Sequence, residues 1–221
     1  MKRQIKIYLP KLLLYIMGLF ILGLAISIVL RTKIGSGAWD AVSYNLHMLT
    51  NQKITVGTAG QIIGIILLSI ILIYRRQLKY AFTLIPILIT GFFIDLWNLI
   101  ILKNFFINEL YAQILFFALA VFLLPFALSL MIQSGLSSMV FDEFTYVLMD
   151  FFKAKSFTLV RICFEIFAIV LAISFGLIAG GQLYEVKYGT IVMAFTIGPL
   201  IDLYLNLYKK MFSKKVVELE E

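Results

Sequence analysis

The sequence predicts an all-α polytopic membrane protein with six transmembrane helices, arranged as two inverted three-helix repeats. Three observations lead to this prediction: an apolar composition, six long segments with few charges, and a motif that recurs about one hundred positions along the chain. Of the 221 residues, 62% are hydrophobic and 14% are charged, whereas soluble domains carry far more charge. A water-soluble fold of this length could not bury so much apolar surface.

Six segments have the length needed to cross a bilayer's hydrocarbon core, which takes about 20 helical residues. Three of them contain no charge, and the other three contain one or two. The first is too long for the core of a signal peptide, so we expect a retained helix. We expect a single membrane domain over residues 1–221, ending in a charged cytoplasmic tail at 209–221. The six segments are residues 12–30, 56–74, 80–102, 111–133, 157–179 and 189–208.

The basic residues are distributed unequally between the two sides of the predicted membrane domain. Thirteen of the 19 Lys and Arg residues fall on the side of the N-terminus and five on the other. Because cytoplasmic loops carry the excess of basic residues, both termini are predicted to be cytoplasmic. The net charge of +7 therefore reflects orientation in a lipid bilayer, and no nucleic-acid partner is expected.

An internal repeat relates residues 12–102 to residues 111–208. Residues 30–40 align with 132–142 at an offset of 102, and residues 91–96 align with 198–203 at an offset of 107. Because each repeat has three spans, the second must enter the membrane from the opposite side. Inverted repeats of this kind are typical of secondary transporters, although duplication kept only for packing is the alternative. The matched pairs are Ser36 with Ser138, Trp39 with Phe141, Asp40 with Asp142, and Asp95 with Asp202.

Two amphipathic segments, 35–50 and 137–152, follow the first span of each repeat and are too short to cross the membrane. Small and hydroxyl residues precede each helix start, and a carboxylate in the first turn favours the helix dipole. These carboxylates are either ordinary helix-end residues or part of re-entrant helices that face a central cavity. On the second interpretation the re-entrant helix starts are Ser36, Trp39, Asp40, Ser138 and Asp142.

Four ionisable residues lie inside predicted spans, where charge is costly and usually faces a bundle interior. Arg161 and Glu165 are four apart and can pair on one helical face, and we expect Asp202 to join them in a three-residue cluster. Asp95 has no basic partner in its own repeat, which makes it the best candidate for binding a coupling proton or cation. Alternatively, Asp95 and Asp202 bond to backbone or to Thr and Asn side chains at helix ends.

No enzyme, metal or cofactor motif is found in the sequence. It has one histidine, His47, one cysteine, Cys163, and no phosphate-binding or zinc-binding pattern. An aspartyl protease would need two carboxylates that share a proton. Asp95 and Asp202 are predicted to differ in depth by roughly 10 Å. We therefore expect no enzyme activity, no cofactor and no metal.

The residues Gly35-Ser36-Gly37-Ala38-Trp39-Asp40, and a Gly198-Pro199 span that follows the Arg161–Glu165 pair, resemble a known family. It is the bacterial YczE/YyaS/YitT family of membrane proteins, and the YczE branch in particular. The resemblance covers nearly the whole chain and implies a multi-pass protein of the bacterial inner membrane without implying a substrate. The chain departs from the pattern at Phe141, which replaces a Trp, and at Phe92, which replaces a Pro.

Three functions are compatible with these features. The first is a small-solute transporter or permease whose cavity is lined by the amphipathic segments and by Asp95, Arg161, Glu165 and Asp202. The second is an accessory or regulatory protein that acts through a membrane partner without transport. The third is the substrate-binding subunit of a vitamin importer, although the Ala-Xaa-Xaa-Xaa-Ala docking face of such subunits is not evident in residues 12–30.

Overall fold

The apolar segments fold into long helices in a computed structural model of the chain, which describes residues 2–136 and 139–217. Six helical stretches in this part are long and apolar enough to cross a membrane, which confirms the six predicted spans and an all-helical fold. The protein is thus a multi-pass membrane protein. Five spans are the helices α1 (Lys2–Thr32), α3 (Val56–Arg75), α5 (Leu110–Ser134), α7 (Phe157–Gly180) and α8 (Tyr188–Val217).

The remaining span is built from three helical segments. A 3₁₀ turn, η1 (Leu78–Thr83), leads into α4 (Leu84–Asp95), and a π-helical stretch, η2 (Leu96–Ile101), continues from it. The Leu102 amide donates to the Trp97 carbonyl five residues back, at 2.8 Å. Such wider turns often lie at functional positions in membrane and soluble helices. The apolar pattern of residues 80–102 gives no sign of this change in helix type.

Two short helices, α2 (Ala38–Leu49) and α6 (Val140–Phe152), follow α1 and α5. They confirm the short helices predicted within 35–50 and 137–152, whereas Ser138 lies outside the described residues. The chain leaves both helices in the same way, because Asn51 after α2 and Lys153 after α6 have left-handed φ values of 52° and 53°. These two residues are 102 positions apart, which is the offset of the sequence repeat.

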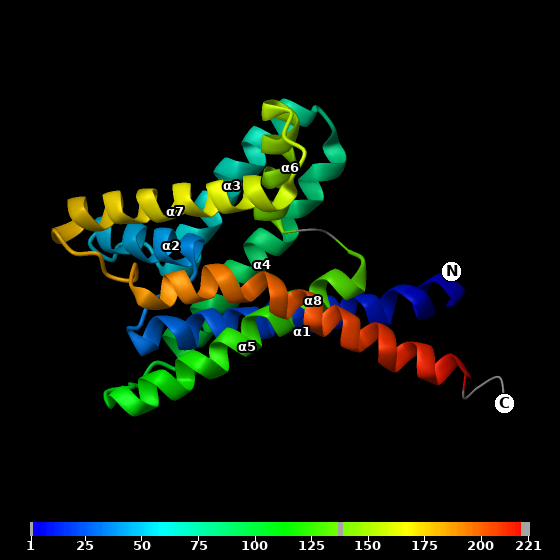
Figure 1. Ribbon diagram of the computed structural model, residues 1–221, viewed down its shortest axis with the longest axis horizontal. Helices are drawn as coiled ribbons and strands as arrows, with labels where there is room; N and C mark the ends of the chain where they lie inside the picture. The colour runs from blue at the N-terminus through cyan, green and yellow to red at the C-terminus, as the bar shows by residue number, and fades with distance from the viewer. Residues whose placement is uncertain (1, 137–138, 218–221) are drawn as a thin grey trace.

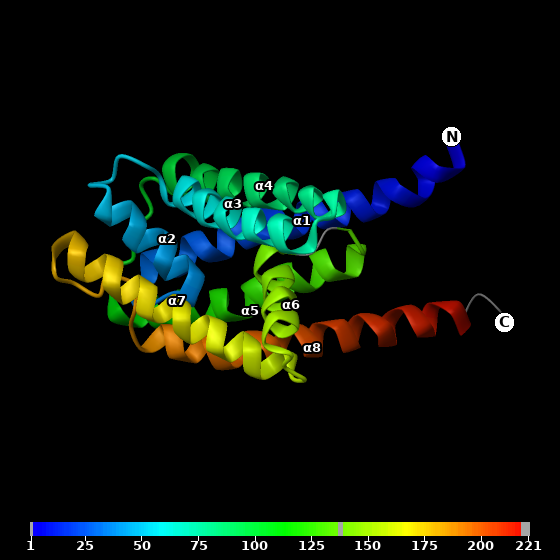
Figure 2. The same cartoon turned by 90° about the horizontal axis from the view of Figure 1, so that it is seen from above.

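The long helices α1 and α5 lie side by side and run in opposite directions (Figure 1, Figure 2). Leu19, Leu22 and Ala25 of α1 are buried in one cluster with Ala120 and residues that follow it on α5. A second buried cluster joins α2 to α3, α6 and α7. The start of α1 and the end of α8 lie at the same end of the molecule (Figure 2), as an even number of spans requires.

The packing of α1–α4 has counterparts in the packing of α5–α8. The helix α1 contacts α4, and α5 contacts α8; α2 contacts α3, and α6 contacts α7; α2 contacts α7, and α6 contacts α3. One pair breaks the correspondence. The helix α3 packs along α4, but among the described residues α7 has no comparable packing against α8.

Candidate functional site

An aromatic cluster forms where the first turns of α2 and α6 meet. The ring of Trp39 on α2 stacks on that of Phe141 on α6, with centroids 5.0 Å apart and planes at 29°. Phe164 of α7 lies 4.5 Å from Trp39 and 5.0 Å from Phe144, measured between ring centroids. The two short helices therefore face each other at their N-terminal ends, with α7 closing one side.

An ion-pair network lies beside this aromatic cluster. The Arg161 guanidinium on α7 donates from Nη1 to Asp142 Oδ1 at 2.7 Å and from Nε to Glu165 Oε1 at 3.0 Å, and its Nη2 lies 2.9 Å from the same Glu165 oxygen. The predicted pairing of Arg161 with Glu165 is confirmed by this geometry. The three side chains are 21% to 43% exposed, so the network lies partly exposed at the protein surface. Burial raises the pKa of Asp142 above its ordinary value, and the charge and hydrogen bond of Arg161 partly oppose that rise.

The third member of this network differs from the prediction. Asp202 was expected there, but Asp142 of α6 occupies the position, and Asp202 is exposed on α8. The physical reason is helix packing, because α8 lies along α5 and not along α7. Within the described residues, Asp202 makes no hydrogen bond or ion pair.

Asp40 is a third carboxylate near this network, and among the described residues it forms no ion pair. It is half-buried in the first turn of α2, and its side chain folds back over Gly37, where an added Cβ would lie 2.7 Å from Asp40 Oδ2. Burial and the nearby charge of Glu165 raise the pKa of Asp40 to about 7. Arg161 thus pairs with two carboxylates, whereas in the described part of the chain Asp40 has no salt bridge.

Asp95 is held by hydrogen bonds at the start of α3. Its Oδ1 accepts from the Gly57 amide at 2.9 Å, and its Oδ2 accepts from the Thr55 hydroxyl. Thr55 is also the N-cap of α3, since its Oγ1 accepts from the Thr58 amide at 3.0 Å. The carboxylate therefore bonds to backbone and a Thr side chain, as the second interpretation of the sequence describes. Whether Asp95 also binds a coupling ion stays a prediction.

Ser36 lies at the start of α2 but does not cap it. Gly37 is the N-cap residue, and the Ser36 amide donates to the Glu185 carbonyl at 3.1 Å. Glu185 belongs to the connection between α7 and α8 and is only 4% exposed. Burial raises its pKa to about 7, although Lys187 and Lys33 oppose the rise. Sequence reasoning did not single out Glu185, because no pattern marks a loop residue as buried.

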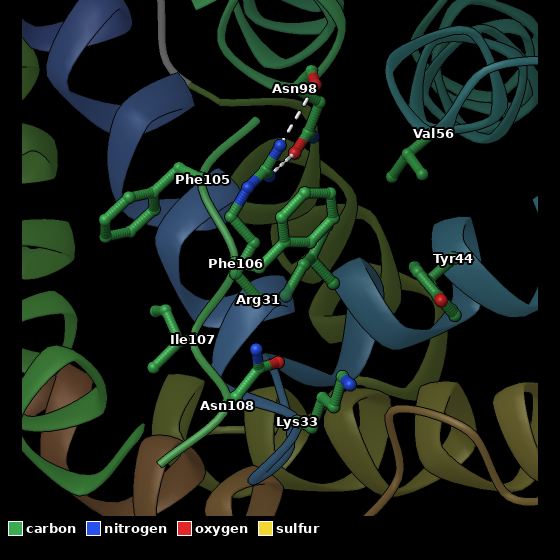
Figure 3. A pocket seen from close by; sticks show the side chains of 10 residues that line it. Arg31, Lys33, Tyr44, Val56, Asn98, Phe105, Phe106, Ile107 and Asn108 are labelled. Carbon is green, nitrogen blue, oxygen red and sulfur yellow. Dashed lines mark hydrogen bonds between the residues drawn. The ribbon is translucent and has the colours of Figure 1, made fainter. Parts of the chain in front are cut away.

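A cavity of about 260 Å³ opens between the ends of α1 and η2 and the connection that follows (Figure 3). Arg31, Lys33, Tyr44, Asn98 and residues 105–108 line it. The Arg31 guanidinium donates to the carbonyls of Asn98 and Leu102, both at 3.0 Å, and to the Asn98 side chain. Arg31 therefore satisfies carbonyls near the π-helical segment, a role that its position at a helix end does not reveal.

Comparison with known proteins places the chain in a family, because a family of unknown function, DUF6198, matches residues 9–206. The chain belongs to the DUF6198 family. It is also similar to the uncharacterized protein YyaS of Bacillus subtilis (strain 168), with 26% identity over 207 residues, which are 93% of this chain and 97% of that protein. No solved structure matches the chain. The YyaS match agrees with the resemblance at the level of the broad group, and the YczE branch stays a prediction.

Proposed function

We propose that this DUF6198 protein is a small-solute transporter of a bacterial cytoplasmic membrane, with cytoplasmic termini and two inverted halves. The antiparallel arrangement of α1 and α5 and the matching packing of the two halves support the inverted repeat. The Gly35–Asp40 motif supports a place in the YczE branch. Inverted repeats of this kind hold the substrate site where the halves meet.

The observation that carries this proposal is the meeting of two half-helices around ionisable groups. The first turns of α2 and α6 contact each other through Trp39 and Phe141. Each of these turns also carries a carboxylate, Asp40 or Asp142. Helix starts directed at the interface of two repeats are the places where secondary transporters bind substrates and coupling ions. The amphipathic segments are then re-entrant helices that line a cavity.

The charges of the site favour a proton or a cation over an anion. Arg161 neutralises part of the charge of Asp142 and Glu165, and Asp40 is left without a cationic partner. A carboxyl group whose pKa is about 7 changes its protonation within the physiological range. Asp40 therefore takes the coupling role that the sequence assigns to Asp95, while Arg161 holds the other two carboxylates in place.

The proposal is tested in vesicles that contain the purified protein and a pH-sensitive dye. A small-molecule extract of bacterial cells is added outside under an imposed proton gradient, and the solutes retained inside are identified by mass spectrometry. We expect at least one solute to accumulate relative to protein-free vesicles, and we expect Asp40→Asn to abolish that accumulation. Glu109→Gln is the control, since Glu109 is exposed at the start of α5 and its side chain caps nothing. Vesicles that accumulate no solute and move no proton would remove the proposal.

An accessory role through a membrane partner is the second candidate. It is favoured by Asp202 and Asn206, which are both exposed and lie one turn apart on α8. Polar groups on a lipid-facing surface are costly, and a partner protein would cover them. Purification from mild detergent would then recover a second protein in fixed proportion, and Asp40→Asn would leave that complex intact.

A further inference from the structure

The contact between α3 and α4 has a definite chemical form. Asp95 on α4 accepts hydrogen bonds from the Thr55 hydroxyl and the Gly57 amide at the start of α3. The backbones approach closely beside it, because a Cβ added at Gly57 would lie 2.1 Å from the Gly91 carbonyl oxygen. A carboxylate and two glycines thus hold the end of α4 against the start of α3.

Equivalent residues occur in the second half of the chain. An offset of 101 carries Thr55 to Ser156 and Gly57 to Thr158, and an offset of 107 carries Asp95 to Asp202. Ser156 is the N-cap of α7, since its hydroxyl oxygen accepts from the Leu159 amide at 3.3 Å. Thr55 has the same role in α3. The second half therefore has both a capping hydroxyl at a helix start and a carboxylate on the following span.

In the second half this contact is not made. Asp202 is exposed, and a Cβ added at Gly198, the counterpart of Gly91, meets nothing within 4 Å. Within the described residues the Ser156 hydroxyl proton has no acceptor, and the amide of Thr158 lies in the first turn, where helices leave their N–H groups unpaired. A carboxylate inside a membrane span is costly without a partner, and these two donors match those that hold Asp95.

We propose that Asp202 and the start of α7 form a gate, which closes when α8 moves against α7. In the closed gate Asp202 accepts hydrogen bonds from the Ser156 hydroxyl and the Thr158 amide, as Asp95 does from Thr55 and Gly57. In the structure, Asp95 makes these hydrogen bonds between α4 and α3, whereas among the described residues Asp202 does not make the equivalent bonds between α8 and α7. This inference rests on the proposed transport function, because a transporter with inverted halves closes its two sides in turn.

One sequence difference explains why the α7–α8 contact is the open one. Gly57 has no side chain and permits the close approach of α3 to Gly91, whereas Thr158 carries a side chain at the equivalent position. The Thr158 side chain therefore keeps α7 further from Gly198 than α3 lies from Gly91. The closed gate is therefore wider and weaker than the α3–α4 contact, and it opens more readily.

The gate is tested by disulfide cross-linking in native membranes, with Cys163→Ser to remove the natural thiol. The pair Thr158→Cys and Gly198→Cys is oxidised, and an intramolecular bond is detected after cleavage of the chain between them. We expect cross-linking to proceed, because the closed state is visited, and Asp202→Asn to slow it about tenfold through loss of charge-assisted hydrogen bonds. Asn206→Ala, one turn further along α8, leaves the rate unchanged.

A positive control shows that the membranes contain folded protein. A Cβ added at Gly60 of α3 would lie 4.0 Å from the Cβ of Ser43 on α2, a separation that suits a disulfide, so the pair Ser43→Cys and Gly60→Cys cross-links in the same preparation. If that pair reacts and the 158–198 pair does not, the gate is wrong. A bond that forms only between two chains would also overturn it, since α8 would then face a second copy. If the protein transports solute but the 158–198 disulfide does not form, the gate is wrong and the transport function stands. If the disulfide forms but the protein transports no solute, the transport function is wrong and the contact between α7 and α8 stands.

Discussion

Trp39 and Phe141 stack face to face although 102 positions separate them in the chain, and their ring centroids are 5.0 Å apart. Each residue lies in the first turn of a short helix that follows a long apolar one. Two equivalent residues can touch only where they lie near an axis that relates their halves. In the proposed inverted arrangement, the stack marks the point about which the two halves are related, and the charged site lies next to it.

This stack should contribute a measurable coupling free energy. In a double-mutant cycle with Trp39→Leu and Phe141→Leu, we expect the two changes to be non-additive by about 0.5–1.5 kcal/mol, the range for aromatic pairs beyond burial alone. Unfolding of the protein in detergent micelles by denaturant supplies the free energies. Additive effects would show that the rings contact each other without stabilising the meeting of α2 and α6.

The different packing of the two halves predicts opposite tolerance to the same substitution. Gly57→Ala places a methyl group against the Gly91 carbonyl oxygen and should lower the free energy of unfolding by about 1–3 kcal/mol. Gly198→Ala meets open space and should change it by less than about 0.5 kcal/mol. Thermal unfolding midpoints of both variants check this, and equal losses would contradict the open arrangement of α7 and α8.

The Arg161 network predicts that replacing Arg161 alone destabilises the protein more than replacing Arg161 together with its two carboxylate partners. Arg161→Met leaves Asp142 and Glu165 close together without their cation, which should destabilise the protein by about 1–3 kcal/mol, given that the groups are partly exposed. Adding Asp142→Asn and Glu165→Gln removes the uncompensated charge and should restore most of the loss. Yield of folded protein and the unfolding midpoint are the measurements. A triple variant less stable than Arg161→Met would show that the polar network itself is required.

The raised pKa of Asp40 predicts a loss of stability with rising pH. The pKa rises from 3.8 to about 7 on folding, so the folded state holds this proton more tightly than the unfolded state does. The stabilisation is complete below about pH 4, falls as the pH rises to about 7, and then levels off. The unfolding midpoint of Asp40→Asn should lack this fall. Both the reference protein and the Asp40→Asn variant carry Glu185→Gln, because the pKa of Glu185 is raised into the same range. If the unfolding midpoint falls equally with pH in the two proteins, the fall does not come from Asp40.

The fold was largely predictable from the sequence, because hydrophobic length decides which segments cross a membrane. The six spans and both short helices follow from apolar runs, charge placement and helical periodicity. The Arg161–Glu165 pair was also predictable, since residues four apart share a helix face. Such features depend on neighbours in the chain, and the sequence contains that information directly.

The charged site was only partly predictable, because it depends on which helices pack together. Asp202 and Asp142 were both candidates to join Arg161, and only the packing of α8 along α5 and of α6 against α7 decides between them. Glu185 is buried by a loop, and Arg31 bonds to a helix distant in sequence. Neither environment leaves a periodic pattern that a single sequence can reveal.

The opposite orientation of the two halves is the claim on which the site, the transport function and the gate all depend. It is tested most directly by labelling single cysteines, Asn51→Cys or Lys153→Cys, in a Cys163→Ser background with a maleimide that does not cross membranes. These residues follow α2 and α6 and have the same left-handed conformation. The account predicts that position 51 reacts in intact cells and that position 153 reacts only after the cells are permeabilised. Labelling of both positions from the same side would contradict it.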